Sequence, residues 1–163
     1  MSRQRIAGSQ FRRRRPGTAG GRAHVRPPRG GGDAEDANDG SVSMRWDFPS
    51  AEVLTLADLG ERGQMRIAAS RALWWGEAQR RVPLVLKVSH HGSADQYPEL
   101  IEWLHPSIAT VSAGIGNPYG HPTRRTLDLL ASIDAVTLRT DELGSIAIVR
   151  KAGGGIGWNV TGR

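Results

Sequence analysis

Three side chains capable of metal or acid–base chemistry stand where apolar runs of the sequence end, and a fourth, His121, lies before a predicted helix. Asp58 closes one run, and the adjacent His90 and His91 close the next and are followed by Gly92. Neutral imidazole is the commonest ligand of transition metals, and it also transfers protons near neutral pH. We therefore expect one of these two histidines to bind a metal ion while the other orients it or contacts substrate. His121 precedes a proline that suits the first turn of a helix, where it can contact a phosphate or a leaving group.

Each of these residues also has a purely structural interpretation. Asp58 could cap a helix or lie in a turn, and His90 and His91 could be satisfied structural histidines at the end of a strand. His121 could be a plain cap residue, and His105 is interpreted as the C-terminal cap of a short helix. Because adjacent residues of a strand point to opposite faces, we expect His90 and His91 to have different roles.

The elements that would position these residues alternate between strands and helices. Apolar runs rich in β-branched residues predict strands, and helically spaced apolar residues with arginines between them predict helices. The expected strands cover 41–48, 51–57, 82–88, 108–112, 135–138 and 145–149, and the expected helices cover 64–80, 98–104 and 122–133. This alternation is typical of a layered α/β domain. Ligands of such folds bind beyond the carboxyl ends of strands, which is where Asp58 stands.

Charge divides the 163-residue chain near residue 40. Residues 1–32 contain nine arginines and no acidic residue, whereas 44–163 contain 13 basic and 12 acidic residues. A basic segment can bind nucleic acid by neutralising phosphates, or remain solvated without a partner. His24 lies in this segment, and we assign it no role in a site. The expected organisation is a disordered Arg/Gly/Pro-rich tail at 1–40, a folded domain at 41–152, and a flexible C-terminal segment at 153–163.

Composition excludes several function classes. The chain contains no cysteine, so disulfides, thiolate zinc ligands and a cysteine nucleophile are excluded. No stretch approaches the roughly 18–20 apolar residues of a membrane span. The basic N-terminus is not followed by the apolar segment of a signal peptide. We therefore expect the chain, as written, to span no membrane and to lie in the cytoplasm.

The motifs, taken in order, resemble a known family, the ComEC-type competence proteins. The segments that carry the resemblance are 38–41, 54–60, 87–93, 117–122 and 139–141. Lys-Val-Ser-His-His-Gly-Ser, Asn-Pro-Tyr-Gly-His-Pro and Arg-Thr-Asp are similar to the C-terminal part of these proteins. The two earlier segments are similar to the family's Asn-Asp-x-Ser stretch and its Thr-Gly-Asp strand end, with Ala57 in place of the glycine. The resemblance implies a metallo-β-lactamase-like domain, an αβ/βα sandwich of which this chain would hold the C-terminal half.

The resemblance also implies a role for each matching residue. Asp58 is similar to the carboxylate that can bridge two metal ions, and His91 to the last metal-ligand histidine. His90 would lie beside the metal or at the substrate, and His121 on the substrate side of the pocket. The implied cofactor is Zn²⁺ or Mn²⁺, and the implied partner is DNA, which we expect to be single-stranded. Two metal ions held in this way would generate a hydroxide and bind a phosphodiester.

The chain departs from the family in its first part. The motif His-x-[His/Asp]-x-Asp-His, the third histidine motif and the membrane channel are all absent from the sequence. Asp58 and His91 supply about two ligands, whereas a catalytic zinc ion usually has three from the protein. Half a sandwich would also leave one face of its sheet without its usual cover, and an exposed apolar face of that size favours association.

Three functional hypotheses follow from these features. The first is a metal-dependent phosphodiesterase or nuclease module associated with DNA uptake and incomplete alone. It would be completed by dimerisation or by a partner, either the missing N-terminal half or the membrane channel part. The second is a non-catalytic remnant or a DNA-binding module that uses the basic tail. The third is another hydrolase of the same superfamily, such as a lactonase-like enzyme. Whether the chain is an enzyme by itself is left open by the sequence.

Overall fold

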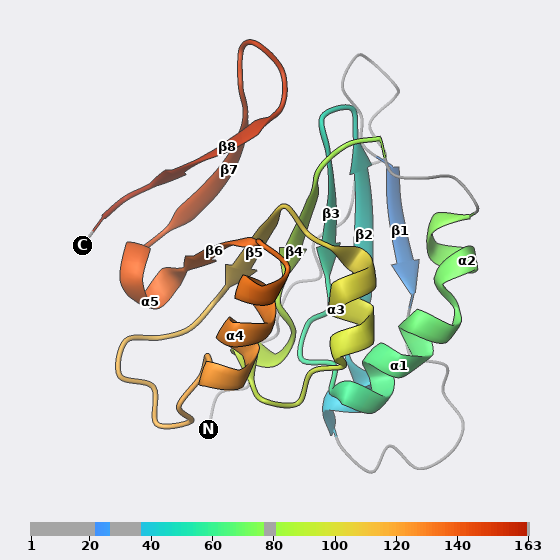
Figure 1. Cartoon of the computed structure of the whole chain (residues 1–163), viewed down its shortest axis with the longest axis vertical. Coiled ribbons are helices and arrows are strands. Elements are labelled where there is room, and N and C mark those ends of the chain that lie inside the picture. Colours follow the sequence, from blue (N-terminus) through green and yellow to red (C-terminus); the bar gives the residue numbers. More distant parts are fainter. Residues whose placement is uncertain (1–21, 27–36, 77–80, 163) are drawn as a thin grey trace, which may run out of the picture.

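The computed structural model describes residues 22–26, 37–76 and 81–162 (Figure 1). The strands are β1 (Arg22–Arg26), β2 (Ser43–Phe48), β3 (Ala51–Thr55), β4 (Leu84–Lys87), β5 (Ile108–Val111), β6 (Val136–Arg139), β7 (Ile146–Arg150) and β8 (Ile156–Val160). The α-helices are α1 (Glu61–Ala69), α2 (Arg71–Trp75), α3 (Pro98–Leu104), α4 (Arg124–Ser132) and α5 (Thr140–Leu143). Two 3₁₀ turns complete the order, η1 (Ala37–Gly40) and η2 (Ser89–Gly92).

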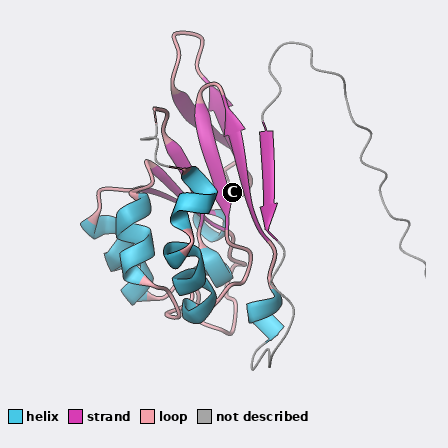
Figure 2. Ribbon diagram, turned by 90° about the vertical axis from the view of Figure 1, so that its right-hand side faces the viewer, coloured by secondary structure: helices cyan, strands magenta, loops and turns pink. Residues whose placement is uncertain are grey.

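The first six strands form one mixed sheet in the order β1-β2-β3-β4-β5-β6. Neighbours are antiparallel from β1 to β3 and parallel from β3 to β6. Helices join the parallel strands: α1 and α2 follow β3, α3 follows β4, and α4 follows β5. These four helices, α1 to α4, gather on one face of the sheet (Figure 2). This arrangement is the α/β class that the sequence predicts.

Alternate residues of the parallel strands face two different apolar clusters. In β4, Leu84 and Leu86 pack in the larger cluster with the helices, whereas Val85 belongs to a smaller one on the opposite face. A strand alternates its side chains in this way because its period is two residues. Fully burying a leucine side chain, as at Leu86, stabilises the fold by roughly 1.5–3 kcal/mol. The smaller cluster contains Val85, Ile108 and Leu138, with Val53, Leu143, Ile146, Ile148 and Ile156 packed against it.

The hairpin of β7 and β8 therefore covers part of the sheet face that does not carry the helices. These two strands pair only with each other among the described residues, as a separate antiparallel sheet. The expectation of an uncovered sheet face is wrong for this part. The face without helices is less covered at β2. Trp46 of β2 pairs with Val53 and so lies on that face. Phe48, two residues further along β2, points the same way and is 42% exposed.

The predicted helix 64–80 is divided in the structure. α1 ends at Ala69 and α2 begins at Arg71, with Ser70 between them outside helical geometry (φ −106°, ψ 17°). The hydroxyl of Ser70 donates to the Arg66 carbonyl at 2.8 Å. A serine that bonds the backbone of the preceding turn competes with helix continuation, which explains the break. Residues 77–80 lie outside the described residues, whereas the predicted helix 98–104 is confirmed by α3.

Three segments differ from the sequence prediction. Their structure depends on contacts with residues that lie elsewhere in the chain. Residues 22–26 were expected in the disordered tail, but they form β1 and pair antiparallel with β2. Residues 156–160, expected to be flexible, form β8, and the expected turn at 141–144 is largely the short helix α5. The rest of the expected tail up to residue 36 lies outside the described residues.

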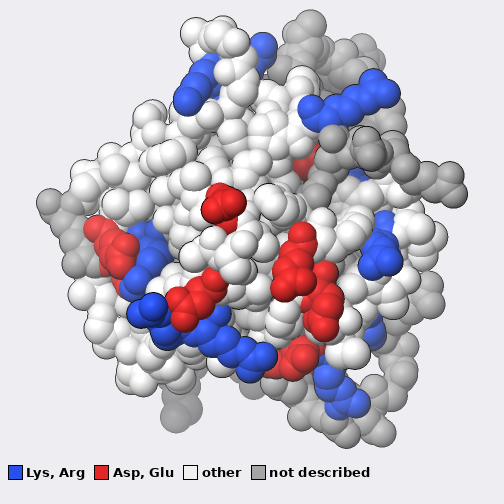
Figure 3. Space-filling view, viewed as in Figure 1, with Lys and Arg blue, Asp and Glu red and all other residues white. Residues whose placement is uncertain are grey.

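The helix-covered face carries both signs of charge. Acidic and basic side chains of the described residues are interspersed over it in this view, and acidic side chains lie beside the basic ones (Figure 3). This distribution agrees with the near balance of charge after residue 43. No helix in the described part of the chain is long and apolar enough to cross a membrane.

Candidate functional site

Parallel strands that are neighbours in the sheet end at the same edge, and four of them contribute a residue there. Asp58 follows β3, His91 follows β4, Ser112 follows β5 and Thr140 begins the helix after β6. The hydroxyl of Thr140 accepts from the Ala113 N–H at 2.9 Å and donates to the Ala113 carbonyl at 2.8 Å. Residues far apart in the sequence therefore meet at the edge where α/β folds bind ligands.

The backbone makes a left-handed turn directly after β4. His90 (φ 45°, ψ 47°), His91 (φ 53°, ψ 21°) and Gly92 (φ 81°) are consecutive residues with positive φ. The His90 N–H donates to the Ala57 carbonyl at 2.9 Å, which ties the turn to the end of β3. Each residue other than glycine in this conformation costs roughly 1–2 kcal/mol, and such strain concentrates at functional sites. The expectation that the histidines point to opposite faces of a strand is wrong, because both lie beyond the strand in this turn.

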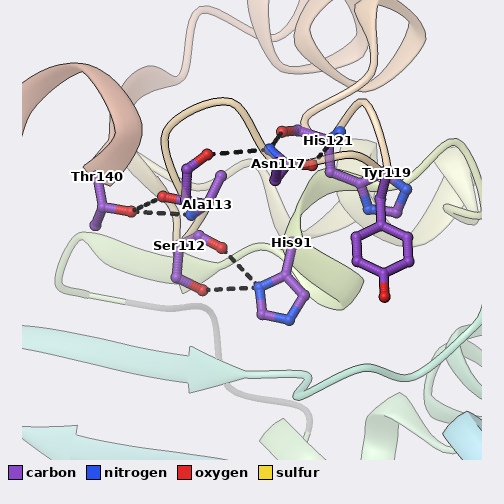
Figure 4. A pocket seen from close by; sticks show the side chains of 8 residues that line it. His91, Ser112, Ala113, Asn117, Tyr119, His121 and Thr140 are labelled. Atoms are coloured by element: carbon purple, nitrogen blue, oxygen red, sulfur yellow. Dashed lines mark hydrogen bonds between the residues drawn. The ribbon is translucent and has the colours of Figure 1, made fainter.

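His91 is oriented by a hydrogen bond to the end of β5 (Figure 4). Its Nδ1 lies 2.6 Å from the Ser112 carbonyl oxygen and 3.3 Å from the Ser112 hydroxyl. A carbonyl oxygen only accepts hydrogen bonds, so Nδ1 carries a proton, and in the neutral form of the ring Nε2 is the nitrogen left to accept or to bind a metal ion. This Nε2 lies 3.5 Å from Oδ1 of Asp58. A backbone carbonyl that fixes the tautomer is the usual support of a metal-binding histidine.

Asp58 receives contacts from two further parts of the chain. Its backbone N–H donates to the Ser41 hydroxyl at 3.2 Å, so the Asn-Asp-Gly-Ser segment packs at the site. The same Oδ1 that faces His91 lies 3.9 Å from Nζ of Lys87, which also donates to the Ala57 carbonyl at 3.2 Å. Burial lowers the pKa of the Lys87 ammonium from its usual value, and the nearby Asp58 acts in the opposite direction.

His90 and His121 form a second pair. Their rings are 5.5 Å apart, centroid to centroid, and meet edge to face at 79°. Asn117 holds the loop of His121: its side-chain amide donates to the His121 carbonyl at 2.6 Å, and its Oδ1 accepts from the His121 N–H at 3.2 Å. Nδ1 of His90 is buried and has no hydrogen-bond partner among the described residues. An unpaired buried polar atom is costly, so a water molecule, an ion or a ligand is expected to satisfy this nitrogen.

His121 does not cap the following helix. α4 begins at Arg124, and its N-terminal cap is Thr123, whose hydroxyl accepts from the Thr126 N–H at 3.4 Å. The interpretation of His121 as a plain cap residue is therefore wrong, and Pro122 lies before the helix rather than in its first turn. The imidazole is free to face the pocket instead.

A pocket of about 410 Å³ opens beside these residues. Figure 4 shows His91 at one side of it, with Tyr119 and His121 at another. Tyr119 is 81% exposed, and its ring lies 6.2 Å from that of His121. The lining residues are His91, Ser112, Ala113, Gly114, Asn117, Tyr119, His121 and Thr140. His91 and His121 therefore share one cavity. Asp58 contacts His91 but is not among the residues that line this pocket.

The pair of Asp58 and His91 fits part of a metal centre. Two ligands bound at about 2.0–2.2 Å in tetrahedral geometry lie roughly 3.4 Å apart, close to the 3.5 Å between Oδ1 and Nε2. Within residues 22–26, 37–76 and 81–162, no group of three or more acidic or histidine side chains is placed to hold a metal ion. The described residues thus offer two of the three protein ligands that a catalytic zinc ion usually has.

Sequence reasoning did not assign roles to Lys87, Ser112 and Asn117. Lys87 carried a usable signal, because it is the charged residue that ends an otherwise apolar strand. Ser112 acts through its carbonyl oxygen, which every residue has, so no residue type could identify it. Asn117 is a typical loop-closing residue, since its amide bonds the backbone a few residues away.

The remaining histidines and Asp141 have structural roles. His105 is the left-handed C-terminal cap of α3 (φ 41°), as the sequence predicts. His24 lies on β1 with Nε2 3.0 Å from Oδ2 of Asp47. Asp141 pairs with the guanidinium of Arg139, and its carboxylate raises the pKa of that group above its ordinary value.

Comparison with known proteins finds a short region of similarity to one bacterial protein. It is 46% identical over 63 residues to ComE operon protein 3 of Bacillus subtilis (strain 168). The match covers 38% of this chain and 8% of that protein, so the chain spans a small part of its relative. No family model matches the chain, and no solved structure matches it significantly.

Proposed function

We propose that this chain carries half of a divalent-metal centre of a phosphodiesterase- or nuclease-type hydrolase that acts on DNA during uptake. One observation supports the proposal above the others: His91 donates from Nδ1 to a backbone carbonyl and turns Nε2 to within 3.5 Å of Asp58 Oδ1. In the neutral ring this geometry turns two atoms that ligate metal ions, an imidazole nitrogen and a carboxylate oxygen, toward each other. DNA is the substrate that the resemblance of the motifs to ComEC-type proteins implies, and the similarity to ComE operon protein 3 is in line with that resemblance.

In this proposal His91 Nε2 and Asp58 Oδ1 are the ligands. A Zn²⁺ or Mn²⁺ ion held there would supply Lewis-acid chemistry for the hydrolysis of a phosphodiester. His121 faces the pocket from a loop that Asn117 holds in place, and it contacts the phosphate or gives a proton to the leaving oxygen. His90 packs against His121 and orients its ring. The pocket beside them receives the nucleotide that flanks the scissile bond.

The centre is proposed to be completed by another polypeptide segment. Two ligands give weak binding, and a third would come from a segment with the His-x-[His/Asp]-x-Asp-His motif that this sequence lacks. Such a segment is expected to belong to an N-terminal half or to the membrane channel part of a ComEC-type protein. The metallo-β-lactamase-like sandwich is part of the same proposal, since the mixed sheet with helices on one face is compatible with its C-terminal half.

The experiment combines metal binding with cleavage of single-stranded DNA. We would purify the full chain and measure Zn²⁺ and Mn²⁺ binding, then cleavage with and without a separate polypeptide that carries the missing motif. Metal-dependent cleavage in the mixture alone is expected. Absence of metal binding and of cleavage in every combination would contradict the proposal and favour a non-catalytic remnant.

A matched pair of variants separates a ligand role from a backbone role. His91 and His105 both have left-handed backbones, with φ of 53° and 41°, and asparagine tolerates this conformation. His91→Asn should abolish metal binding and cleavage, whereas His105→Asn should leave both unchanged. Equal effects of the two substitutions would mean that folding, not ligation, is being measured.

A further inference from the structure

Tyr119 lines the pocket beside the proposed ligands but leaves most of its ring in solvent. It is 81% exposed, and it shares the pocket with His91 and His121 (Figure 4). Neither hydrophobic cluster of the described residues contains it. Because hydrophobic stabilisation scales with the apolar area removed from water, this ring contributes little to the fold. Its face is open to contact with a ligand.

The loop that carries Tyr119 is closed by hydrogen bonds from Asn117. The side-chain amide of Asn117 donates to the carbonyl of Gly114, before the tyrosine, at 3.1 Å, and to that of His121, after it, at 2.6 Å. Oδ1 of Asn117 accepts from the His121 N–H at 3.2 Å. A ring on a loop that is already ordered loses less conformational freedom when a ligand binds, so more of the contact energy appears as affinity.

The polar side chains that line the pocket are largely engaged with the protein itself. Both amide hydrogens of Asn117 are used in its loop, and the Thr140 hydroxyl exchanges two hydrogen bonds with Ala113. The Ser112 hydroxyl lies 3.3 Å from Nδ1 of His91. Among the described residues that line the pocket, none is Asp, Glu, Lys or Arg. This lining suits a flat, uncharged group better than a phosphate, and it offers few groups to read that group by hydrogen bonding.

We infer that Tyr119 is the stacking platform for an unpaired nucleobase of the DNA, which makes the site selective for single strands and indifferent to base sequence. The inference rests on the proposed function and deepens it: the phosphodiester lies at Asp58 and His91, and the neighbouring base lies on the ring of Tyr119. Every base has a flat face, so stacking on an aromatic ring tolerates any sequence. A base inside a duplex is already stacked and paired, so it is not accessible to this ring.

The test measures binding of short DNA strands to the full chain in EDTA, so that no metal ion contributes. Fluorescence anisotropy compares an oligothymidylate of about six nucleotides with a strand of the same length and charge that lacks every base. Phosphate contacts of the arginine-rich residues 1–32 are common to both strands, because the two carry equal charge. The wild-type chain should bind the base-bearing strand at least about fivefold more tightly, the lower limit for stacking of one base.

Two further ligands test the selectivity. Strands of cytosine or adenine should bind within about threefold of the thymine strand, since stacking differs only modestly among the bases. A DNA duplex at equal phosphate concentration should compete no better than the strand without bases. A duplex that competes as well as oligothymidylate, or a much larger spread among the bases, would overturn the selectivity assigned to Tyr119.

Three variants assign the preference to the ring. Tyr119→Ala should bind the strands with and without bases equally, whereas Tyr119→Phe keeps the ring and should keep the preference. Ile115→Ala is the matched control, because Ile115 lies in the same loop, is 74% exposed and does not line the pocket. It should bind as the wild type does. An unchanged preference in Tyr119→Ala, or an equal loss in Tyr119→Phe or Ile115→Ala, would overturn stacking on Tyr119.

Mn²⁺ binding by the same proteins separates this inference from the proposed function. Tyr119→Ala should bind Mn²⁺ as the wild type does, because Tyr119 is not a ligand of the proposed centre. A base preference that Tyr119→Ala removes, in a chain that binds no Mn²⁺, supports stacking and overturns the metal centre. Mn²⁺ binding without any base preference overturns stacking and leaves the metal centre standing. Loss of Mn²⁺ binding in Tyr119→Ala also overturns the role, since the tyrosine would then support the structure of the site.

Discussion

Gly92 lies against Pro122 so closely that a Cβ atom on Gly92 would be 2.7 Å from Cβ and 3.1 Å from Cα of Pro122. The Thr123 N–H also donates to the Gly92 carbonyl at 2.8 Å. The turn that presents His90 and His91 is therefore packed directly on the segment that presents His121. This contact makes the two histidine motifs one structural unit.

Gly92→Ala should reduce the free energy of unfolding by about 2–4 kcal/mol, because a clash with Pro122 adds to the strain of a left-handed alanine. Gly116→Ala is the control. Gly116 also has a positive φ (62°), but no atom of the described residues beyond its chain neighbours lies within 4 Å of an added Cβ. Only the strain of about 1–2 kcal/mol therefore applies. Urea denaturation measures both losses, and equal losses would show that the contact with Pro122 does not matter.

Ala57→Gly should stabilise the protein by up to about 1 kcal/mol. Ala57 has φ 51°, a conformation that glycine adopts without the steric cost an alanine incurs. The gain is partly offset by the greater freedom of glycine in the unfolded chain. Ala131→Gly in the exposed part of α4 should instead cost about 0.5–1 kcal/mol. Thermal unfolding of the two variants should therefore shift in opposite directions, and a downward shift for both would contradict the strain at Ala57.

Thr140→Val should cost about 1–3 kcal/mol, because the Ala113 N–H loses the hydroxyl that accepts from it. Ala113 follows Ser112, whose carbonyl orients His91, so we also expect Mn²⁺ affinity to fall about tenfold. Thr140→Ser retains the hydroxyl and should restore both stability and affinity. Chemical denaturation and metal titration provide the two measurements. Unchanged Mn²⁺ affinity in a destabilised Thr140→Val variant would show that the hydrogen bond between Thr140 and Ala113 does not support the metal site.

Arg45→Met should lower the free energy of unfolding by about 3 kcal/mol, because it leaves the buried Glu52 without its cation. Nη2 of Arg45 lies 2.6 Å from Oδ1 of Asp47 and 3.9 Å from Oε1 of Glu52, and the indole N–H of Trp75 donates to Glu52 Oε2 at 3.1 Å. The double variant Arg45→Met/Glu52→Gln should recover much of the loss, since it removes the unpaired charge and keeps an acceptor for the indole. Tryptophan fluorescence during denaturation reports on Trp75. If the double variant recovers no stability, the loss comes from the broken ion pair of Arg45 with Asp47.

The sequence by itself determined the α/β class, most of the strands and the order of the motifs. These features are local: the period of apolar residues fixes the type of an element, and a polar residue after an apolar run marks its end. That is why the sequence alone places Asp58 and the two adjacent histidines after strands. It is also why the boundaries of α3 agreed with the prediction.

Only the tertiary structure decided which of these residues face each other. The pairing of Asp58 with His91, and of His90 with His121, depends on a left-handed turn that an ordinary strand pattern does not reveal. The role of Ser112 comes from a carbonyl oxygen, and β1 exists because β2 offers it an edge to pair with. In the sequence Lys87 is one charged residue in an apolar strand. Its contact with Oδ1 of Asp58 exists because β3 and β4 pair in parallel and end side by side. Contacts between residues distant in the chain arise from packing, and packing is not encoded in any local period.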